Sequence, residues 1–239
     1  MPAYTFVSAG TVVTSSSGAV LSPVGSAVSG GNLLILMTGQ RGNGGSIIDL
    51  APDWTQLGAY TTGGSLNIWG RIASGTSADE PAVDWSATNN SFAWIEQYSG
   101  DVYTDLASIV AHIGTASSNQ AALRAAGASI TTDNCLLILL SRKNCAAANA
   151  TTFTAPGSFT KRQSLIANTN HWAVSGSWQQ TSPTDFAEQN WTDDDTADEV
   201  TTTNSLILAL KTDSGGGGGG GLILPTMDDW IADYTHLRM

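Results

Sequence analysis

Two short apolar runs decide the fold: Asn32-Leu33-Leu34-Ile35-Leu36-Met37, and its near copy Asn134-Cys135-Leu136-Leu137-Ile138-Leu139. Each run is about as long as a β-strand and is soon followed by a polar segment. Continuous apolar runs of this length are typical of strands that are covered on both faces. The sequence therefore predicts one central strand in each half of the chain.

Other strand-like segments lie around these two, each bounded by Gly, Asn, Ser, Asp or Pro. The seven clearest cover residues 33–37, 66–72, 92–98, 107–113, 135–140, 171–179 and 205–211. In the second of them, Leu66 and Ile68 fall on one face, whereas Trp69 and Arg71 fall on the other. Helix-forming segments are nearly absent before residue 213. The exception is residues 119–127, which are predicted to form a short helix or an Ala-rich loop. Many short strands with turns between them favour an all-β sandwich or barrel.

The two halves also share an order of features, which indicates a diverged internal repeat. After each apolar run come a Pro-containing turn, a Trp-bearing strand, an acidic segment with a second Trp, and a closing strand. The matched pieces are 32–37 with 134–139, 51–55 with 155–160, Trp85 with Trp191, and 90–95 with 204–209. A spacing of roughly one hundred residues, seen twice, does not fit a solenoid. The repeat predicts two similar four-stranded halves that fold together as one antiparallel sandwich.

Five motifs of the chain form a recognisable set: Gly-Asn-Leu-Leu-Ile-Leu at 31–36, Ala-Pro-Asp-Trp-Thr-Gln-Leu at 51–57, Trp-Gly-Arg-Ile-Ala at 69–73, the stretch from 95 to Tyr-Ser-Gly at 98–100, and 204–210. Together they resemble a jelly-roll-like β-sandwich family that is common in tailed-phage virion proteins. The family has a "GDLLL" strand before a "P-x-G-W" turn, and a "Y-S-G" closes its first half. This chain has Asn32 and Asp53 where the family has Asp and Gly. The resemblance covers residues 25–211 and implies a virion location on capsid, neck or tail, with no catalytic residues to transfer.

Composition excludes several other classes of protein. The 239 residues include 9 Lys plus Arg and 20 Asp plus Glu, which gives a net charge of −11. Such an acidic chain lacks the basic surface that binds nucleic acid or anionic membranes. No apolar run approaches the ~20 residues of a membrane-spanning helix, and residues 1–10 lack the pattern of a signal peptide. The two cysteines, Cys135 and Cys145, are expected to be free thiols, although a hairpin bridge between them is conceivable.

The C-terminal part is predicted to be separate from the sandwich, which takes residues 1–213. Residues 214–221 are Ser followed by seven glycines, among them Gly215, Gly218 and Gly221, and form a flexible linker. Residues 222–239 form a docking peptide that begins with Leu222, Ile223 and Leu224.

An amphipathic helix is predicted over residues 226–238. Thr226 and Asp229 make a start like a capping box. The apolar face of this helix comprises Met227, Trp230, Ile231, Tyr234 and Leu237. A helix this short is marginal alone, so its face either docks on another protein, folds back on its own sandwich, or stays disordered. We expect docking on another protein.

Candidate chemistry is sparse. His112, His171 and His236 share no metal-binding spacing, and the acidic cluster around Asp193 lacks the order of a calcium loop. Asp79, Glu80 and Asp84 could in principle pair as glycosidase carboxylates, but acidic loop residues are usually solubilising. The sequence therefore predicts no enzyme, no cofactor and no metal.

Seven tryptophans belong to the predicted sandwich, and aromatic rings of this kind either fill a core or stack on sugars. They are Trp54, Trp69, Trp85, Trp94, Trp172, Trp178 and Trp191. The matched positions of Trp85 and Trp191 favour core packing. We therefore expect a homo-oligomeric, trimeric virion structural protein that decorates the capsid or attaches to tail or neck. It would contact other virion proteins through its C-terminal peptide. The alternative is a tail-fibre module that binds host glycan.

Overall fold

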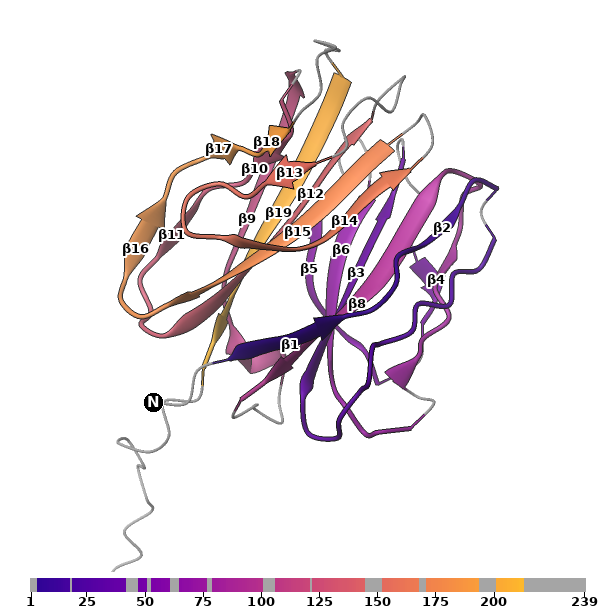
Figure 1. Cartoon of the computed structure of the whole chain (residues 1–239), viewed down its shortest axis with the longest axis horizontal. Helices are drawn as coiled ribbons and strands as arrows, with labels where there is room; N and C mark the ends of the chain where they lie inside the picture. Colours follow the sequence, from indigo (N-terminus) through magenta and orange to yellow (C-terminus); the bar gives the residue numbers. More distant parts are fainter. Residues whose placement is uncertain are drawn as a thin grey trace, which may run out of the picture.

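The chain forms two large antiparallel β-sheets that pack face to face (Figure 1). This computed structural model describes residues 4–17, 19–41, 47–50, 53–60, 65–76, 79–100, 106–120, 122–144, 152–167, 171–193 and 201–212. Among them, no helix is long and apolar enough to cross a membrane. The prediction of an all-β sandwich is confirmed.

The first sheet has the order β1-β8-β3-β6-β5, and β2 also pairs with β8. Its strands are β1 (Thr5–Ala9), β2 (Val13–Ser15), β3 (Leu33–Gln40), β5 (Thr55–Tyr60), β6 (Ser65–Ile72) and β8 (Ser91–Ser99). The predicted apolar run is therefore the central strand, β3, which pairs with β6 on one side and β8 on the other.

The second sheet has the order β14-β15-β12-β19-β9. Its strands are β9 (Val110–Gln120), β12 (Cys135–Asn144), β14 (Thr160–Ala167), β15 (His171–Gln180) and β19 (Thr201–Lys211). A short 3-10 helix, η2 (Ala107–Ile109), leads into β9. The second apolar run again becomes the central strand, β12, between β15 and β19.

The main core lies between the two sheets. Leu33, Ile35 and Met37 of β3 belong to the same buried cluster as Leu136, Ile138 and Leu140 of β12. Alternate residues of the same strands, such as Leu34 and Leu137, belong to two further clusters on the outer faces. Both central strands are thus covered on both faces, which explains why their sequences are continuously apolar.

Short strand pairs cover the outer faces. The pair β4 (Ile47–Asp49) and β7 (Asp84–Trp85) contributes to the cluster on the first sheet. On the second sheet, residues of three more pairs enter the outer cluster: β10 (Arg124–Ala125) with β17 (Gln189–Asn190), β11 (Ala128–Ile130) with β16 (Thr184–Phe186), and β13 (Phe153–Thr154) with β18 (Thr192–Asp193). Residues 124–125 are therefore strand, and the short helix considered for 119–127 is wrong, because this segment pairs with β17 and packs on the outer face.

The two sheets agree in strand order and in register. Strands β5, β6, β3, β8 and β1 occupy the places that β14, β15, β12, β19 and β9 occupy in the other sheet. Leu33 pairs with Tyr98 and Ile72, and Leu136 pairs likewise with Leu210 and Gln179. Leu33 thus corresponds to Leu136, one residue beyond the predicted alignment of Asn32 with Asn134.

Two β-bulges also recur at corresponding positions. In β5 the extra residue is Leu57, after two regular pairs, and in β14 it is Arg162, again after two regular pairs. In β1 the extra residue is Val7, and in β9 it is Ala111. Both sheets therefore share their irregularities as well as their regular pairing.

The disulfide considered for Cys135 and Cys145 is excluded by the length of β12. Cys135 is its first residue and is buried with a free thiol, and Cys145 directly follows its last residue. Nine strand steps of ~3.3 Å separate the two ends by about 30 Å. A disulfide holds its two Cα atoms within about 7 Å, so these cysteines cannot bridge within one chain.

Candidate functional site

A buried carboxylate between the two sheets is the least expected feature of the core. Glu96 lies in β8 and is fully buried, on the same strand face as Trp94 and Tyr98. The Tyr98 hydroxyl donates to Oε2 at 2.6 Å, and the Trp94 indole nitrogen donates to Oε1 at 3.2 Å. Ser175 of β15 donates to Oε1 from the opposite sheet. Glu96 therefore joins the two sheets through hydrogen bonds.

A cation and an aromatic ring extend this cluster towards the β1–β14 edge. Arg162, the bulge residue of β14, donates from Nε to the Ser177 hydroxyl at 2.7 Å. Its guanidinium carbon lies 4.4 Å from the centre of the Phe6 ring, which is a cation–π contact between the two sheets. We call Glu96, Tyr98, Ser175, Ser177 and Arg162 the polar corner.

Burial determines the protonation chemistry of the polar corner. Burial raises the pKa of the Glu96 carboxyl, and the hydrogen bonds from Ser175, Tyr98 and Trp94, with the charge of Arg162, only partly oppose it. Burial and the neighbouring Glu96 carboxyl raise the pKa of Tyr98 well above its usual value. The group can thus hold a proton between the sheets, under conditions in which an exposed glutamate would release it.

The second sheet supplies an apolar counterpart to the polar corner. By strand register, Leu208 of β19 corresponds to Glu96, and Leu210 corresponds to Tyr98. Facing them, Ile68 and Gly70 of β6 correspond to Ser175 and Ser177, and Leu57 corresponds to Arg162. The same packing is therefore achieved elsewhere in this molecule without polar groups, so the fold itself does not require the polar corner.

A second carboxylate is held in a tight cradle next to a surface hollow. Asp79 is buried and accepts hydrogen bonds from the backbone of Ser74, Gly75 and Thr76, and from Arg71 Nε at 2.8 Å. Burial would raise the pKa of this carboxyl, but the hydrogen bonds from Ser74, Arg71 and Gly75 outweigh burial and lower it.

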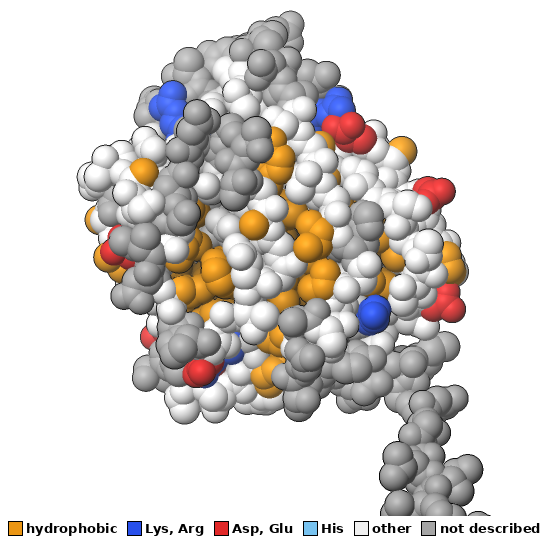
Figure 2. Space-filling view, turned by 180° about the vertical axis from the view of Figure 1, so that it is seen from behind, with side chains coloured by type: hydrophobic (Ala, Val, Ile, Leu, Met, Phe, Trp, Pro, Cys, Tyr) orange, Lys and Arg blue, Asp and Glu red, His pale blue; other side chains and the backbone are white. Residues whose placement is uncertain are grey.

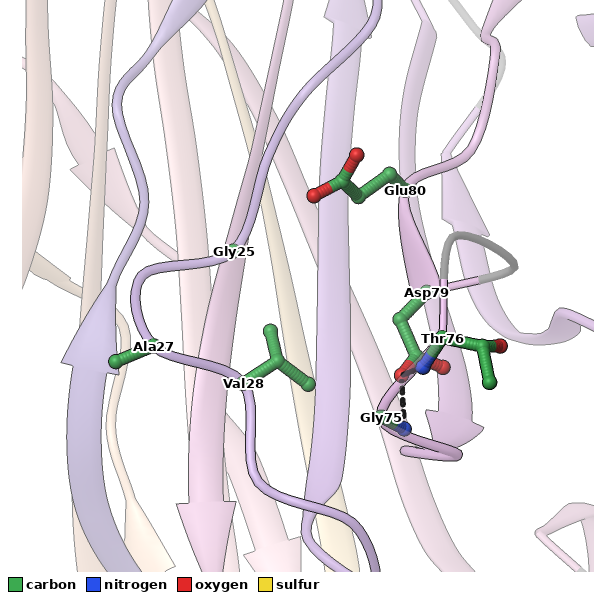
Figure 3. A pocket seen from close by; sticks show the side chains of 7 residues that line it. All are labelled: Gly25, Ala27, Val28, Gly75, Thr76, Asp79 and Glu80. Atoms are coloured by element: carbon green, nitrogen blue, oxygen red, sulfur yellow. Dashed lines mark hydrogen bonds between the residues drawn. The ribbon is translucent and has the colours of Figure 1, made fainter.

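The hollow has a volume of about 440 Å³ and is lined by Gly25, Ala27, Val28, Gly75, Thr76, Asp79 and Glu80 (Figure 3). Figure 3 shows the Asp79 carboxylate turned towards the Gly75 nitrogen. Both of its oxygens are occupied by these contacts, so Asp79 fixes the backbone of residues 74–76 and is a poor candidate for acid–base catalysis. Glu80 is exposed and Asp84 is half-buried in β7.

A buried cation occupies the other end of the inter-sheet space. Arg142 of β12 is fully buried, and its guanidinium donates to the side-chain oxygens of Asn144 at 3.0 Å and Asn204 at 2.7 Å. Burial lowers the pKa of Arg142 to about 10. The amide oxygens solvate this cation and make it a structural group.

The described residues bring none of the other candidate ligands together. His112 lies in β9 and His171 in β15, with β19 and β12 between them in the sheet. Among the residues that the structure describes, no group of three or more His, Cys, Asp or Glu could hold a metal ion. Asp193 belongs to β18, whereas the acidic residues that follow it lie outside the described residues.

The tryptophans of the sandwich are core residues. Five are buried: Trp54, Trp85, Trp94, Trp172 and Trp191. Trp69 and Trp178 are partly buried and pack against the two outer clusters. In the described part of the chain, no tryptophan is exposed for stacking on a sugar, so nothing here favours the glycan-binding alternative.

The predicted docking residues lie outside the described residues. These are Leu222, Ile223, Leu224, Met227, Trp230, Ile231, Tyr234 and Leu237, together with the linker glycines Gly215, Gly218 and Gly221. The polar corner, by contrast, was missed at the sequence level. A charged residue at an inward position between Trp94 and Tyr98 was the available signal, but only the register of β8 shows that Glu96 faces Ser175.

Comparisons with the profiles of known families, with curated proteins and with solved structures find no match for this chain.

Proposed function

We propose that this protein is a structural subunit of a tailed-phage virion. It would decorate the capsid or attach to tail or neck, and its C-terminal peptide would fasten it to neighbouring virion proteins. It acts without catalysis and without a cofactor, as a homo-oligomer that binds neither nucleic acid nor membrane. We expect this homo-oligomer to be a trimer.

The observation that carries this proposal is the position in the sequence at which the described sandwich ends. The last strand, β19, completes the second sheet at Lys211. Thr212 then donates from its backbone nitrogen, at 3.0 Å, and from its hydroxyl, at 2.6 Å, to the carbonyl of Asn134. Among the described residues, both sheets and the three core clusters are built from residues up to Thr212. The glycine run and the apolar peptide that follow lie outside the described residues, and in this proposal they fasten the sandwich to an external partner.

The finer description of the fold is a second part of the proposal. We propose that the sandwich is jelly-roll-like and that its halves descend from one duplicated unit. The equal strand order supports a duplication, as do the shared register and the two recurring bulges. Bulges are kept within families as designed features, and two at matching positions are hard to obtain independently.

Particle assembly tests the proposed function. We would delete residues 215–239 and supply the shortened chain to particles that are assembled without the full-length protein. The sandwich is expected to stay folded, with unchanged circular dichroism and melting temperature, but to be lost from purified particles. A tethered peptide on several symmetric copies gains strength from effective concentration, so the loss should be at least tenfold.

Two matched variants separate the role of the docking peptide from that of the glycine linker. Trp230→Ser with Ile231→Ser keeps the full length and should reduce incorporation as the deletion does, whereas shortening the glycine run by two residues should not. Normal incorporation of the deleted chain would overturn the proposal.

A further inference from the structure

The two sheets of the sandwich end in four edge strands, three of which are protected against pairing with another strand. In the first sheet, the β1–β2 edge is interrupted between Ala9 and Val13, and β5 has six residues with a bulge. In the second sheet, β14 has a bulge and carries Lys161 and Arg162. Interruptions, bulges, short strands and lysines are the usual devices that keep an edge from pairing.

The fourth edge, β9, has none of these devices along most of its length. It is eleven residues long, and its pairing with β19 is regular from His112 to Gln120 after one bulge at Ala111. The strand has no Lys, Arg, Asp, Glu or Pro. β9 is the last strand of the second sheet, and among the described strands only β19 pairs with it.

The corresponding edge of the other sheet is an internal control. By register, β1 and β2 together match β9, with Ala9 in the place of Ile113 and Val13 in the place of Ala116. Where β9 continues without a break, the pairing with β8 stops after Gly10, whose backbone nitrogen still donates to the Ile95 carbonyl, and resumes at Val13. The continuous edge of β9 is therefore not imposed by the fold.

Several side chains next to this edge are apolar and only partly buried. Ile113 is on the inward face, since it pairs with the core residue Leu208, yet 45% of its surface is exposed. Tyr60 of β5 and Val110 are only partly buried against the same core cluster. Figure 2 shows the side of the molecule opposite β1 and β14, with hydrophobic side chains gathered across its middle and charged ones towards its rim.

We propose that β9 is a self-association surface, through which two copies of this chain pair edge to edge as antiparallel strands. The register that overlaps all nine regular residues is centred on Ala116 and places Thr115 opposite Ser117 of the other copy. The two five-stranded sheets would then continue as one sheet across a twofold axis.

The absence of charged residues along β9 is what permits a second copy as the occupant. Two chains with a net charge of −11 repel each other over most of their surface. An uncharged strand of eleven residues lets them meet without opposing like charges. The apolar segment 222–224 of this chain, which is followed by Pro225, would cover only three of these positions.

The test is the mass of the full-length chain in solution, measured by light scattering and sedimentation across concentrations. We expect a mass of two copies for the natural sequence, or of six where the proposed trimer also forms and the β9 edges join two trimers. Thr115→Lys places two like charges side by side at the junction and should shift the protein at least tenfold towards single copies. Thr14→Lys makes the same change at an exposed position of β2, on the interrupted edge, and should leave the mass unchanged.

Hydrogen exchange gives an independent readout. The backbone amides of residues 112–120 that do not bond to β19 should be protected at high protein concentration and lose that protection in Thr115→Lys, while β19 stays protected. A single-copy mass for the natural sequence at all concentrations would overturn the proposal. A three-copy mass that Thr115→Lys leaves unchanged would also overturn it. The C-terminal peptide is not involved, so either result leaves the fastening proposal intact.

Discussion

At the scale of single residues, Glu96 shows that a glutamate can occupy an inward core position when its neighbours supply hydrogen bonds. The strand position of Glu96 is filled by Leu208 in the second sheet, where the packing is wholly apolar. A buried polar network that is fully hydrogen-bonded is tolerated, whereas a half-satisfied one is destabilising. The polar corner and its counterpart are two solutions to one packing problem, and the molecule contains both.

Replacing residues of the polar corner by those of its apolar counterpart tests this view directly. Glu96→Leu alone should lower the free energy of unfolding by about 1–3 kcal/mol, because Tyr98 and Ser175 lose their buried acceptor. Glu96→Leu with Ser175→Ile reproduces the Leu208 and Ile68 pair and should recover the share of that loss that comes from Ser175. Urea unfolding of the two single variants and the double variant measures the coupling. Additive effects of the two substitutions would contradict the prediction.

The raised pKa of Glu96 predicts a pH dependence of stability. The folded state keeps a proton on Glu96 at pH values where the unfolded chain has lost it. This contribution is full below the ordinary glutamate pKa and is lost as pH rises through the raised folded value. Glu96→Gln cannot ionise, so the unfolding free energy of the natural protein minus that of this variant should fall as pH rises above the ordinary glutamate pKa, by up to ~1.4 kcal/mol per pH unit.

Urea unfolding at four pH values checks this slope. Asp79 has the opposite sign, since its lowered pKa adds stability that is lost only as pH falls below its ordinary value. Its contribution is common to both proteins and cancels in the difference. A difference that is flat with pH would show that Glu96 ionises in the folded state as it does in the unfolded chain.

At the scale of elements, apolar pattern predicted the strands that lie in the middle of each sheet. β3, β6, β8, β12, β15 and β19 all fall where the sequence placed a strand, because strands covered on both faces must be apolar or clearly alternating. The edge strands β1, β5 and β14 were not predicted. One or more of their faces meets solvent, so polar residues such as Lys161 and Gln163 interrupt the pattern that identifies a strand.

Register was harder to predict than strand position. The sequence aligned Asn32 with Asn134, but the inward faces align Leu33 with Leu136, one residue further. A shift of one residue exchanges the two faces of a strand, and a run of leucine and isoleucine looks the same in either phase. The sequence likewise does not show which face of a strand a polar residue lies on. The position of Glu96 between the sheets could therefore be found only from the structure.

At the scale of the whole molecule, the two halves depend on each other for their main core. The inter-sheet cluster takes residues such as Ile35 and Trp94 from the first sheet, and Ile138 and Leu208 from the second. A sheet separated from its partner would expose this entire face to water. The outer clusters, by contrast, are each built within one half of the chain. Each half thus carries its own cover but lacks the layer that completes its inner face.

Splitting the chain between Gly100 and Leu106 should therefore give two fragments that fold only together. Fragments 1–103 and 104–239, produced separately, are expected to be insoluble or to lack the sheet signal in circular dichroism, because burial of the inner face drives folding. Produced together, they should copurify through a tag on one fragment and regain that signal. Ile138→Asp, which puts a charge into the shared core, should abolish recovery. A stable, soluble single half would mean that the covers and hydrogen bonding suffice, and that the sandwich is two domains rather than one.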